Sequence, residues 1–126
     1  MTDDEQPTGY AERLGARVEQ TAEGRARARF EVTDEHLNAA GTLHGGVLAT
    51  LVDTAMGAAV RSATDDADVP ATSQLTVTYL RPGKPGPLEV TAQVRTRGEH
   101  LTVCDADVVQ DGRDLVHAVA TFALLH

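Results

Sequence analysis

Residues 45–60 read GGVLATLVDTAMGAAV, and they form the one long stretch of the chain with a helical pattern. Apolar side chains occur on nearly every side of a helix built from these residues, with one charged residue, Asp53, among them. Such a helix is typical of a protein interior, because a helix on a wet surface carries a polar face. The stretch therefore predicts a helix enclosed by protein on most sides.

Strand patterns lie on both sides of this helix. Before it, RARARFEV at 25–32 alternates apolar and charged residues, which is typical of a half-buried strand. We expect it to pair with a strand at 17–20 through a turn at 22–24. After the helix we expect strands at about 71–80, 88–96, 101–109 and 115–125, separated by turn sequences that include an Asp-Gly pair at 111–112. The order predicts an α+β fold in which a curved antiparallel sheet of five to six strands wraps around one long central helix.

The length predicts a single domain covering residues 1–126. We expect residues 1–8 to be a flexible tail, followed by a short helix at 10–14. The lone cysteine, Cys104, rules out an internal disulfide and fits a reducing compartment. The first residues lack the basic and apolar segments of a signal peptide, and no apolar run approaches about 18 residues, so we expect a cytoplasmic protein without a membrane span.

The charge balance bears on possible partners. Eleven basic against nineteen acidic residues give a formal net charge of -8. A surface of that sign repels nucleic acid and anionic membranes unless it carries a basic patch, and none is evident in the sequence. We therefore expect no nucleic-acid or membrane partner. The acidic, lysine-poor composition fits either a high-salt cytoplasm or a merely acidic protein.

Asp53 is the first candidate for chemistry. An ionised carboxylate removed from water is costly unless it is paired, so a lone one within an apolar helix requires a reason. Gly46, Thr50 and Gly57 share its helix face, and small residues permit close approach of a ligand or a second helix. Two non-catalytic alternatives stay open: a solvent-facing position at the helix edge, or a carboxylate that caps a neighbouring loop.

The segment NAAGTLHGG at 38–46, which leads into the helix, is the second candidate. Glycines at a helix start expose backbone N–H groups at the positive end of the helix dipole, where a developing oxyanion can be stabilised. The alternative is a tight turn in which glycine is needed for a positive φ.

Gly45 and Asp53 are too far apart to act together within one chain. Eight residues separate them by about 12 Å along the helix, too far to hold the same reacting carbon. If two copies pair with their helices side by side, Gly45 of one chain can face Asp53 of the other. We therefore expect a site shared across a two-fold interface.

The segments HLNAAGTLHGGVLATLVDTAMGAA at 36–59 and TSQLTVTYLRPGKPG at 72–86, with the alternating C-terminal half, resemble the hotdog-fold acyl-CoA thioesterases, specifically their PaaI-like (phenylacetic acid degradation) branch. The resemblance extends from about Leu14 onward. Its motif is Asn38 six residues before His44, the pair that follows this histidine, and Asp53 nine residues after it. A sister branch carries glutamate at the position of Asp53, so aspartate favours the PaaI-like branch.

The resemblance implies hydrolysis of an acyl-CoA thioester, without metal or organic cofactor, by a homodimer or a dimer of dimers. It implies that the backbone N–H of Gly45, helped by the side-chain amide of Asn38, polarises the thioester carbonyl. Asp53 is implied as general base on water or as nucleophile, and both roles stay open. His44 is implied near the thioester sulfur, with a packed or capping histidine as the alternative.

The resemblance also implies a hydroxyl that holds the attacking water. The candidates are Thr72 and Ser73, of which the alignment of the YLRP run favours Thr72. Gln74 is a candidate contact to the acyl group. Arg81 and Lys84 are candidates for binding the coenzyme A phosphates, with a solvated turn as the alternative. Gly46 and Thr50 complete the candidate substrate contacts.

The remaining polar candidates favour ordinary roles. Cys104 alternates onto the apparent inner face of its strand, which predicts a small core side chain. His44 and Asp53 point to opposite sides of the helix, which argues against a metal. The other histidines lack ligand spacing: His36, His100, His117 and His126.

Two competing functions stay open beside thioester hydrolysis. A non-catalytic acyl-CoA or lipid-binding hotdog module is the main alternative, and in it Asp53 is structural. A related hotdog enzyme acting on acyl carrier protein thioesters is the other.

Overall fold

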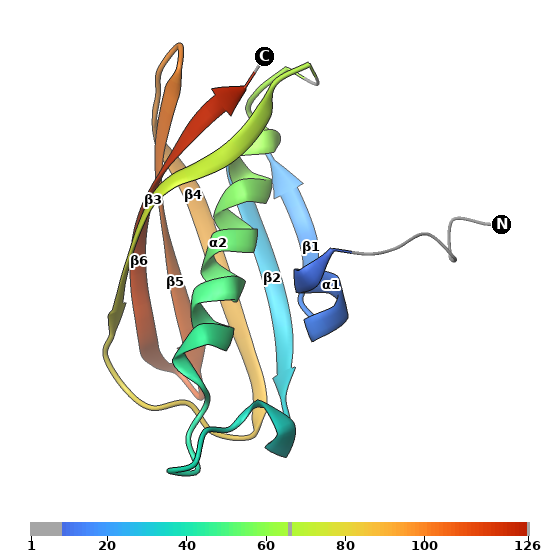
Figure 1. Ribbon diagram of the computed structural model, residues 1–126, viewed down its shortest axis with the longest axis vertical. Helices are drawn as coiled ribbons and strands as arrows, with labels where there is room; N and C mark the ends of the chain where they lie inside the picture. Colours follow the sequence, from blue (N-terminus) through green and yellow to red (C-terminus); the bar gives the residue numbers. More distant parts are fainter. Residues whose placement is uncertain (1–8, 66, 126) are drawn as a thin grey trace, which may run out of the picture.

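Helix α2 (Gly45–Arg61) crosses one side of a six-stranded antiparallel sheet in the computed structural model, which describes residues 9–65 and 67–125. Figure 1 shows this helix in green, in front of the sheet. A short helix, α1 (Tyr10–Leu14), precedes the first strand, and a 3₁₀ turn, η2 (Asp34–His36), follows the second. The strands, in their spatial order, are β1 (Arg17–Ala22), β2 (Arg25–Val32), β4 (Gly86–Arg97), β5 (Leu101–Gln110), β6 (Arg113–Leu125) and β3 (Val69–Tyr79). The expected α+β architecture, with the helix inserted after the second strand, is confirmed.

The two hairpin turns expected from sequence are also confirmed. Asp111 and Gly112 have φ values of 53° and 76°, and Glu23 and Gly24 have 50° and 85°. Positive φ at both central residues is the geometry that matches the twist of a tight hairpin. Element ends differ from the predicted ones by at most two residues. The tail expected at 1–8 lies outside the described residues, and the single domain over 1–126 stays a prediction.

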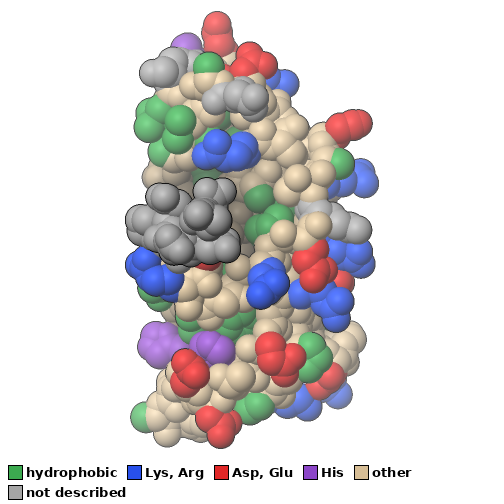
Figure 2. Space-filling view, turned by 90° about the vertical axis from the view of Figure 1, so that its right-hand side faces the viewer, with side chains coloured by type: hydrophobic (Ala, Val, Ile, Leu, Met, Phe, Trp, Pro, Cys, Tyr) green, Lys and Arg blue, Asp and Glu red, His purple; other side chains and the backbone are tan. Residues whose placement is uncertain are grey.

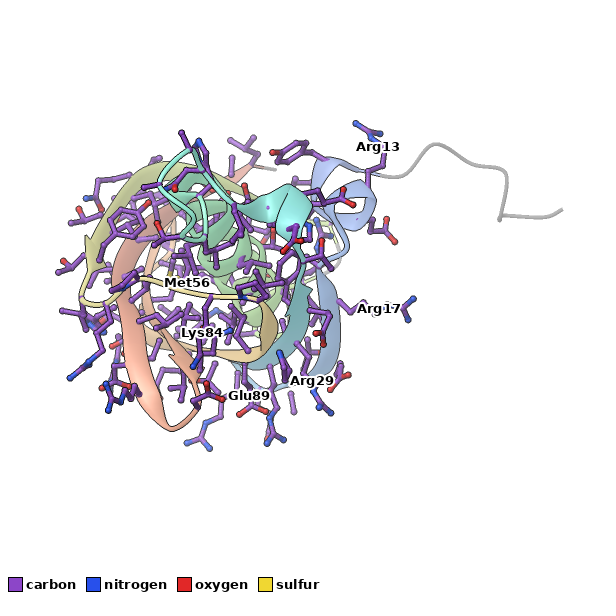
Figure 3. All side chains as sticks on the ribbon, turned by 90° about the horizontal axis from the view of Figure 1, so that it is seen from below. Arg13, Arg17, Arg29, Met56, Lys84 and Glu89 are labelled. Atoms are coloured by element: carbon purple, nitrogen blue, oxygen red, sulfur yellow. The ribbon has the colours of Figure 1, made fainter. Side chains whose placement is uncertain are left out.

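Alternation along the strands separates an inner face, packed on α2, from an outer face. In β2 the alanines, Phe30 and Val32 are buried, and the charged residues between them are exposed. Figure 3 looks along the molecule from below: the sheet curves around α2, Met56 lies inside the curve, and Arg29 and Glu89 lie on the outside. The inner face and the helix thus form one apolar core.

Cys104 belongs to this core, as predicted. Its side chain is fully buried on β5. Burial raises the pKa of its thiol to about 12, and the negative charges of Asp105 and Asp53 add to this effect. A thiol with such a pKa is not a nucleophile at neutral pH.

One side of α2 is not covered by the sheet. Asp53 lies on this open side with Thr50 and Gly57, and all three are half-buried. From Val47 to Val60 every helix residue is buried or half-buried, so the helix is enclosed by protein on most sides, as predicted, and the half-buried residues mark the side that the sheet leaves open. Strand β3 stands at one end of the strand order, so one of its edges has no neighbouring strand within the described residues.

Among the described residues, no helix combines the length and the apolar character needed to cross a membrane. Figure 2 shows the β1 side of the molecule, where basic and acidic side chains are interspersed.

Candidate active site

The open side of α2 carries the stripe of small residues around Asp53. The Thr50 hydroxyl donates to the Gly46 carbonyl at 2.9 Å, one turn earlier in the helix. The Thr50 hydroxyl is thus engaged within the helix. The carboxylate of Asp53 is the charged group on this side of α2.

Thr72 of β3 contacts this carboxylate directly. Its hydroxyl donates to Oδ1 of Asp53 at 2.7 Å. Hydrogen bonds to an ionised acceptor are short and strong, and here the bond joins a strand to a helix across 19 residues of sequence. Asp53 is therefore held by a hydroxyl of a different element, and within residues 9–65 and 67–125 its second oxygen accepts no hydrogen bond.

A β-bulge in β3 decides which hydroxyl reaches Asp53. Thr72 pairs with Phe122 of β6, a buried inner-face residue, whereas Gln74 pairs with its neighbour Thr121, so the register shifts between the two. A bulge adds one residue to a strand and re-aims the side chains beyond it. Ser73, the extra residue, donates to the carbonyl of Thr121 at 3.1 Å and is thereby separated from Asp53.

The same bulge moves Gln74 to the outer face of the sheet. Its side-chain amide donates to the hydroxyl of Thr76, which also faces outward. The structure therefore does not bring Gln74 together with Thr72 and Asp53, although all three were candidates for one site.

The start of α2 leaves one backbone donor without a partner. A helix has four N–H groups at its start that its own carbonyls cannot satisfy, here those of residues 44–47. The N–H of His44 donates to the carbonyl of His36 at 2.9 Å, and that of Val47 to the carbonyl of His44 at 3.0 Å. The N–H of Gly46 donates to Nδ1 of the His44 ring at 2.9 Å. Of these four N–H groups, that of Gly45 is the one without a hydrogen-bond acceptor among residues 9–65 and 67–125.

Neither glycine at this helix start has a positive φ, so the tight-turn alternative is wrong. Side chains explain the pair instead. A Cβ on Gly45 would lie 3.2 Å from Oη of Tyr79, and one on Gly46 would lie 3.2 Å from Nδ1 of His44. Both side chains approach the backbone so closely that a methyl group would displace them.

Tyr79 is the site residue that the sequence analysis missed. It is the last residue of β3, and its hydroxyl donates to the carbonyl of Gly45 at 2.8 Å. One sequence signal was available: it is one of only two tyrosines in the chain, at the end of a strand otherwise rich in threonine and valine. Nothing in the sequence, however, indicated that the end of β3 reaches the helix start.

Asn38 organises the loop before α2. Its side-chain oxygen accepts from the N–H groups of Ala40 and Thr42, at 2.9 and 3.1 Å, and its amide donates to the Thr42 hydroxyl at 3.0 Å. These bonds close the 38–42 turn, and none of them joins Asn38 to Gly45. The structure thus gives Asn38 a local role in shaping the loop.

Arg81 and Lys84 lie in the corner after β3, where both have partners. Arg81 donates to the carbonyl of Asp114 at 2.9 Å, and Lys84 forms an exposed ion pair with Asp111 at 3.0 Å. Exposed pairs of this kind contribute little to stability, so an anionic ligand could compete for these cations.

Two hollows flank the helix start. One, of about 450 Å³, is lined by Gly45, Gly46, Tyr79 and Arg81 among others. The second, of about 380 Å³, lies toward α1 and is lined in part by His44 and Gly46. A larger hollow of about 950 Å³ is lined by residues of β1, β2, β4 and β5, and by none of α2. We place the candidate site at α2, because that is where the half-buried carboxylate and the open N–H donor lie.

Within the described part of the chain, no three His, Cys, Asp or Glu side chains gather closely enough to hold a metal. The histidines are engaged separately. His36 accepts from the N–H of Thr33 at 2.9 Å, and His117 pairs with Asp107 at 2.8 Å on the outer face. His126 lies outside the described residues.

Comparison with known proteins identifies the family. Residues 40–117 match the Thioesterase superfamily. The chain belongs to this superfamily. The match spans both the helix start and Asp53, and most of the sheet. The expected hotdog fold and the resemblance to PaaI-like thioesterases are thereby confirmed.

Individual members of the superfamily are similar over most of the chain. Acyl-coenzyme A thioesterase PaaI of Escherichia coli is 36% identical over 107 residues, which are 84% of this chain and 74% of PaaI. The solved PaaI structure superposes with a TM-score of 0.86 at 32% identity, covering 92% of this chain and 83% of that one. A protein of Halobacterium salinarum named as an esterase is 42% identical over 102 residues, or 76% of this chain and 66% of its own length. The chain thus spans about two thirds of that relative.

One of the similar solved structures was determined with coenzyme A. This protein of Streptococcus pneumoniae TIGR4, described as a thioesterase with coenzyme A, has a TM-score of 0.81 and 29% identity, with coverage of 88% of this chain and 86% of that one.

Proposed function

We propose that this protein hydrolyses an acyl-CoA thioester to a carboxylic acid and free coenzyme A. The observation that carries the proposal is the half-buried Asp53 carboxylate on the open side of α2, bound by the Thr72 hydroxyl at 2.7 Å. The superfamily membership supports it, as do the names of relatives that act on acyl-CoA and the relative solved with coenzyme A.

The chemistry needs a group that delivers oxygen to the carbonyl carbon and a donor for the oxyanion. Asp53 acts either as a general base that takes a proton from water, or as a nucleophile that forms an anhydride which water then cleaves. In both cases the carbon–sulfur bond breaks, the sulfur leaves with a proton, and one water is consumed. The open N–H of Gly45, at the positive end of α2, stabilises the oxyanion.

Two copies of the chain are needed to combine these groups. Gly45 and Asp53 are about 12 Å apart along one helix, so each serves a different reacting carbon. The unpaired edge of β3 and the uncovered side of α2 are the surfaces on which a second copy would close the site. A homodimer, alone or within a tetramer, therefore carries two sites, each built from Gly45 of one chain and Asp53 of the other.

The remaining candidates take supporting roles in this proposal. His44 caps the helix start through Nδ1 and lies beside the thioester sulfur. Asn38 shapes the loop that holds Gly45, and Arg81 and Lys84 attract the coenzyme A phosphates. Gln74 faces away from Asp53 of its own chain, and we leave it out of the site.

The test is a panel of aryl and aliphatic acyl-CoA substrates, with release of free thiol followed for each. Wild type should hydrolyse at least one of them, and Asp53→Ala and Asp53→Asn should reduce kcat by at least about a hundredfold, the order expected for loss of a general base. Asp107→Asn, a carboxylate change on the outer face, serves as the control and should retain activity.

Two other outcomes would replace the proposal. Binding of acyl-CoA without turnover, unaffected by Asp53→Asn, would indicate a non-catalytic acyl-CoA or lipid-binding module. Turnover of acyl carrier protein thioesters, with none of matched coenzyme A thioesters, would indicate the carrier-protein enzyme.

A further inference from the structure

The peptide unit that joins Gly45 to Gly46 is held at both of its polar ends. At one end its carbonyl accepts the Tyr79 hydroxyl at 2.8 Å. At the other end its N–H donates to Nδ1 of His44 at 2.9 Å. Three side-chain and backbone groups thus form one chain of hydrogen bonds: the Tyr79 hydroxyl, the peptide and the His44 ring.

Both glycines fit this arrangement. At Gly45 a Cβ would lie 3.2 Å from Oη and 3.3 Å from Cζ of Tyr79, so the ring rests directly on the backbone. At Gly46 a Cβ would lie 3.2 Å from Nδ1 of the His44 ring. A side chain at either position would require the ring beside it to move by a few tenths of an ångström.

We propose that Tyr79 is a positioning residue that fixes the plane of the Gly45–Gly46 peptide and, through it, the His44 ring and the adjoining His44–Gly45 peptide, which carries the Gly45 N–H. The inference rests on the proposed thioesterase function, in which that N–H is the oxyanion donor. A hydrogen bond to a peptide carbonyl polarises the whole unit, which strengthens the bond made by its N–H. The N–H of Gly46 is therefore directed onto Nδ1, which orients the His44 ring.

Burial in the core does not account for the position of Tyr79. It is 51% exposed and lines the hollow beside Gly45 and Gly46. It also connects β3 to the helix start across 34 residues of sequence. Since Thr72 and Tyr79 lie on the same strand, β3 holds the Asp53 carboxylate near one end and the start of α2 at the other.

The experiment compares Tyr79→Phe with Thr78→Val in the full-length protein. Thr78 is the preceding residue and points to the outer face, so its variant also removes one hydroxyl from β3 but leaves the peptide untouched. In Tyr79→Phe we expect kcat to fall by about three- to tenfold, the effect of one ordinary hydrogen bond, with KM within about twofold of wild type. Thr78→Val should keep both constants.

NMR spectroscopy distinguishes a Tyr79 that orients the Gly45–Gly46 peptide from one that only stabilises the fold. In Tyr79→Phe the amide proton of Gly46 should shift upfield, and the Nδ1 signal of His44 should change, because the bond between them weakens. Wild-type kcat in Tyr79→Phe would overturn the inference, and so would a reduced kcat with unchanged Gly46 and His44 signals. If wild type hydrolyses no substrate, the proposed function fails, but the resonance measurement still decides whether Tyr79 controls the peptide.

Discussion

Replacing Thr72 with valine tests the contact that defines the candidate site. Valine has nearly the same shape as threonine, so the change removes the hydroxyl with little loss of packing. The hydroxyl donates to Asp53 Oδ1 at 2.7 Å, and hydrogen bonds to charged groups contribute about 1.5–3 kcal/mol. Because Thr72 is exposed and Asp53 half-buried, we take the lower half of this range, which corresponds to a reduction of kcat by roughly ten- to fortyfold.

Two companion variants make this prediction specific. Thr72→Ser keeps a hydroxyl and should retain most of the activity. Ser73→Ala removes the adjacent hydroxyl, which donates to the carbonyl of Thr121, and should leave kcat close to wild type.

The assay is steady-state release of free thiol from the best acyl-CoA substrate, with denaturant unfolding run in parallel. The free energy of unfolding should fall by up to about 2 kcal/mol in Thr72→Val, because the same hydrogen bond stabilises the folded state, and should change by less than about 1 kcal/mol in Thr72→Ser and Ser73→Ala. Wild-type kcat in Thr72→Val would refute the reasoning. A loss in Ser73→Ala as large as that in Thr72→Val would also refute it, because the bulge would then not select between the two hydroxyls.

Three further predictions concern the scaffold. The buried side chain of Gln110 accepts from the N–H of Lys84 at 3.0 Å and donates to its carbonyl at 2.8 Å. Gln110→Ala should therefore lower the free energy of unfolding by about 1–3 kcal/mol. An unchanged denaturation midpoint would argue against this role of Gln110. The Cys104 thiol, with its pKa raised from 9.0 to about 12, should resist thiol reagents in the folded protein. Between pH 9 and 12 the folded state keeps the thiol proton and the unfolded state loses it, so the free energy of unfolding should fall as the pH rises through this range. Rapid labelling of the native protein by a thiol reagent at pH 8 would contradict the burial of Cys104. Chains with a net charge of -8 repel each other, so the assembly should dissociate more readily at low ionic strength; light scattering that gives a constant mass down to dilute buffer would count against it.

The sequence was sufficient to predict the fold because its patterns are local. Strict alternation at 25–32, an Asp-Gly turn and one apolar helix define strands, hairpin and insertion point, and all three are confirmed. The pattern also predicted an enclosed helix, and no residue from Val47 to Val60 is exposed. Apolar residues on all sides predict burial, but they do not reveal that one side of α2 lacks cover from its own chain.

Within the candidate site, positions that depend on helix geometry could be predicted from the sequence, and positions that depend on strand register could not. The spacing of Gly46, Thr50 and Asp53 placed them on one face of α2, because a helix has a fixed period. The sequence did not show that Gln74 and Thr72 lie on opposite faces of the sheet, because the bulge at Ser73 shifts the alternation of β3 by one residue and no local signal marks it. Tyr79 was missed for a related reason: its contact with Gly45 depends on how the end of β3 packs against the helix start.

The glycine pair shows that the structural reason for a residue can differ from the reasons that the sequence offers. Gly45 and Gly46 were singled out as donors, with positive φ as the alternative explanation. Their φ values are not positive, and the close approach of Tyr79 and His44 accounts for both residues. The open N–H of Gly45 can be identified only when the hydrogen-bond acceptors of the His44, Gly46 and Val47 N–H groups are known, and the sequence does not give these acceptors.

The central claim, that each site combines Gly45 of one chain with Asp53 of another, can be tested by mixing two inactive variants. Gly45→Pro removes the N–H at the first helical position, where proline is tolerated, and the extended ψ of 132° at His44 suits a residue that precedes proline. Gly45→Ala, which keeps the N–H but meets the same Tyr79 contact, is the control for crowding.

The decisive measurement is the turnover of a 1:1 mixture of Gly45→Pro and Asp53→Ala chains, unfolded together and refolded. Random pairing makes about half of the dimers mixed, and each mixed dimer holds one intact site of two, so the account predicts about a quarter of wild-type turnover per chain. A refolded mixture that contains mixed dimers, as shown by mass, and stays as inactive as its two components would contradict it.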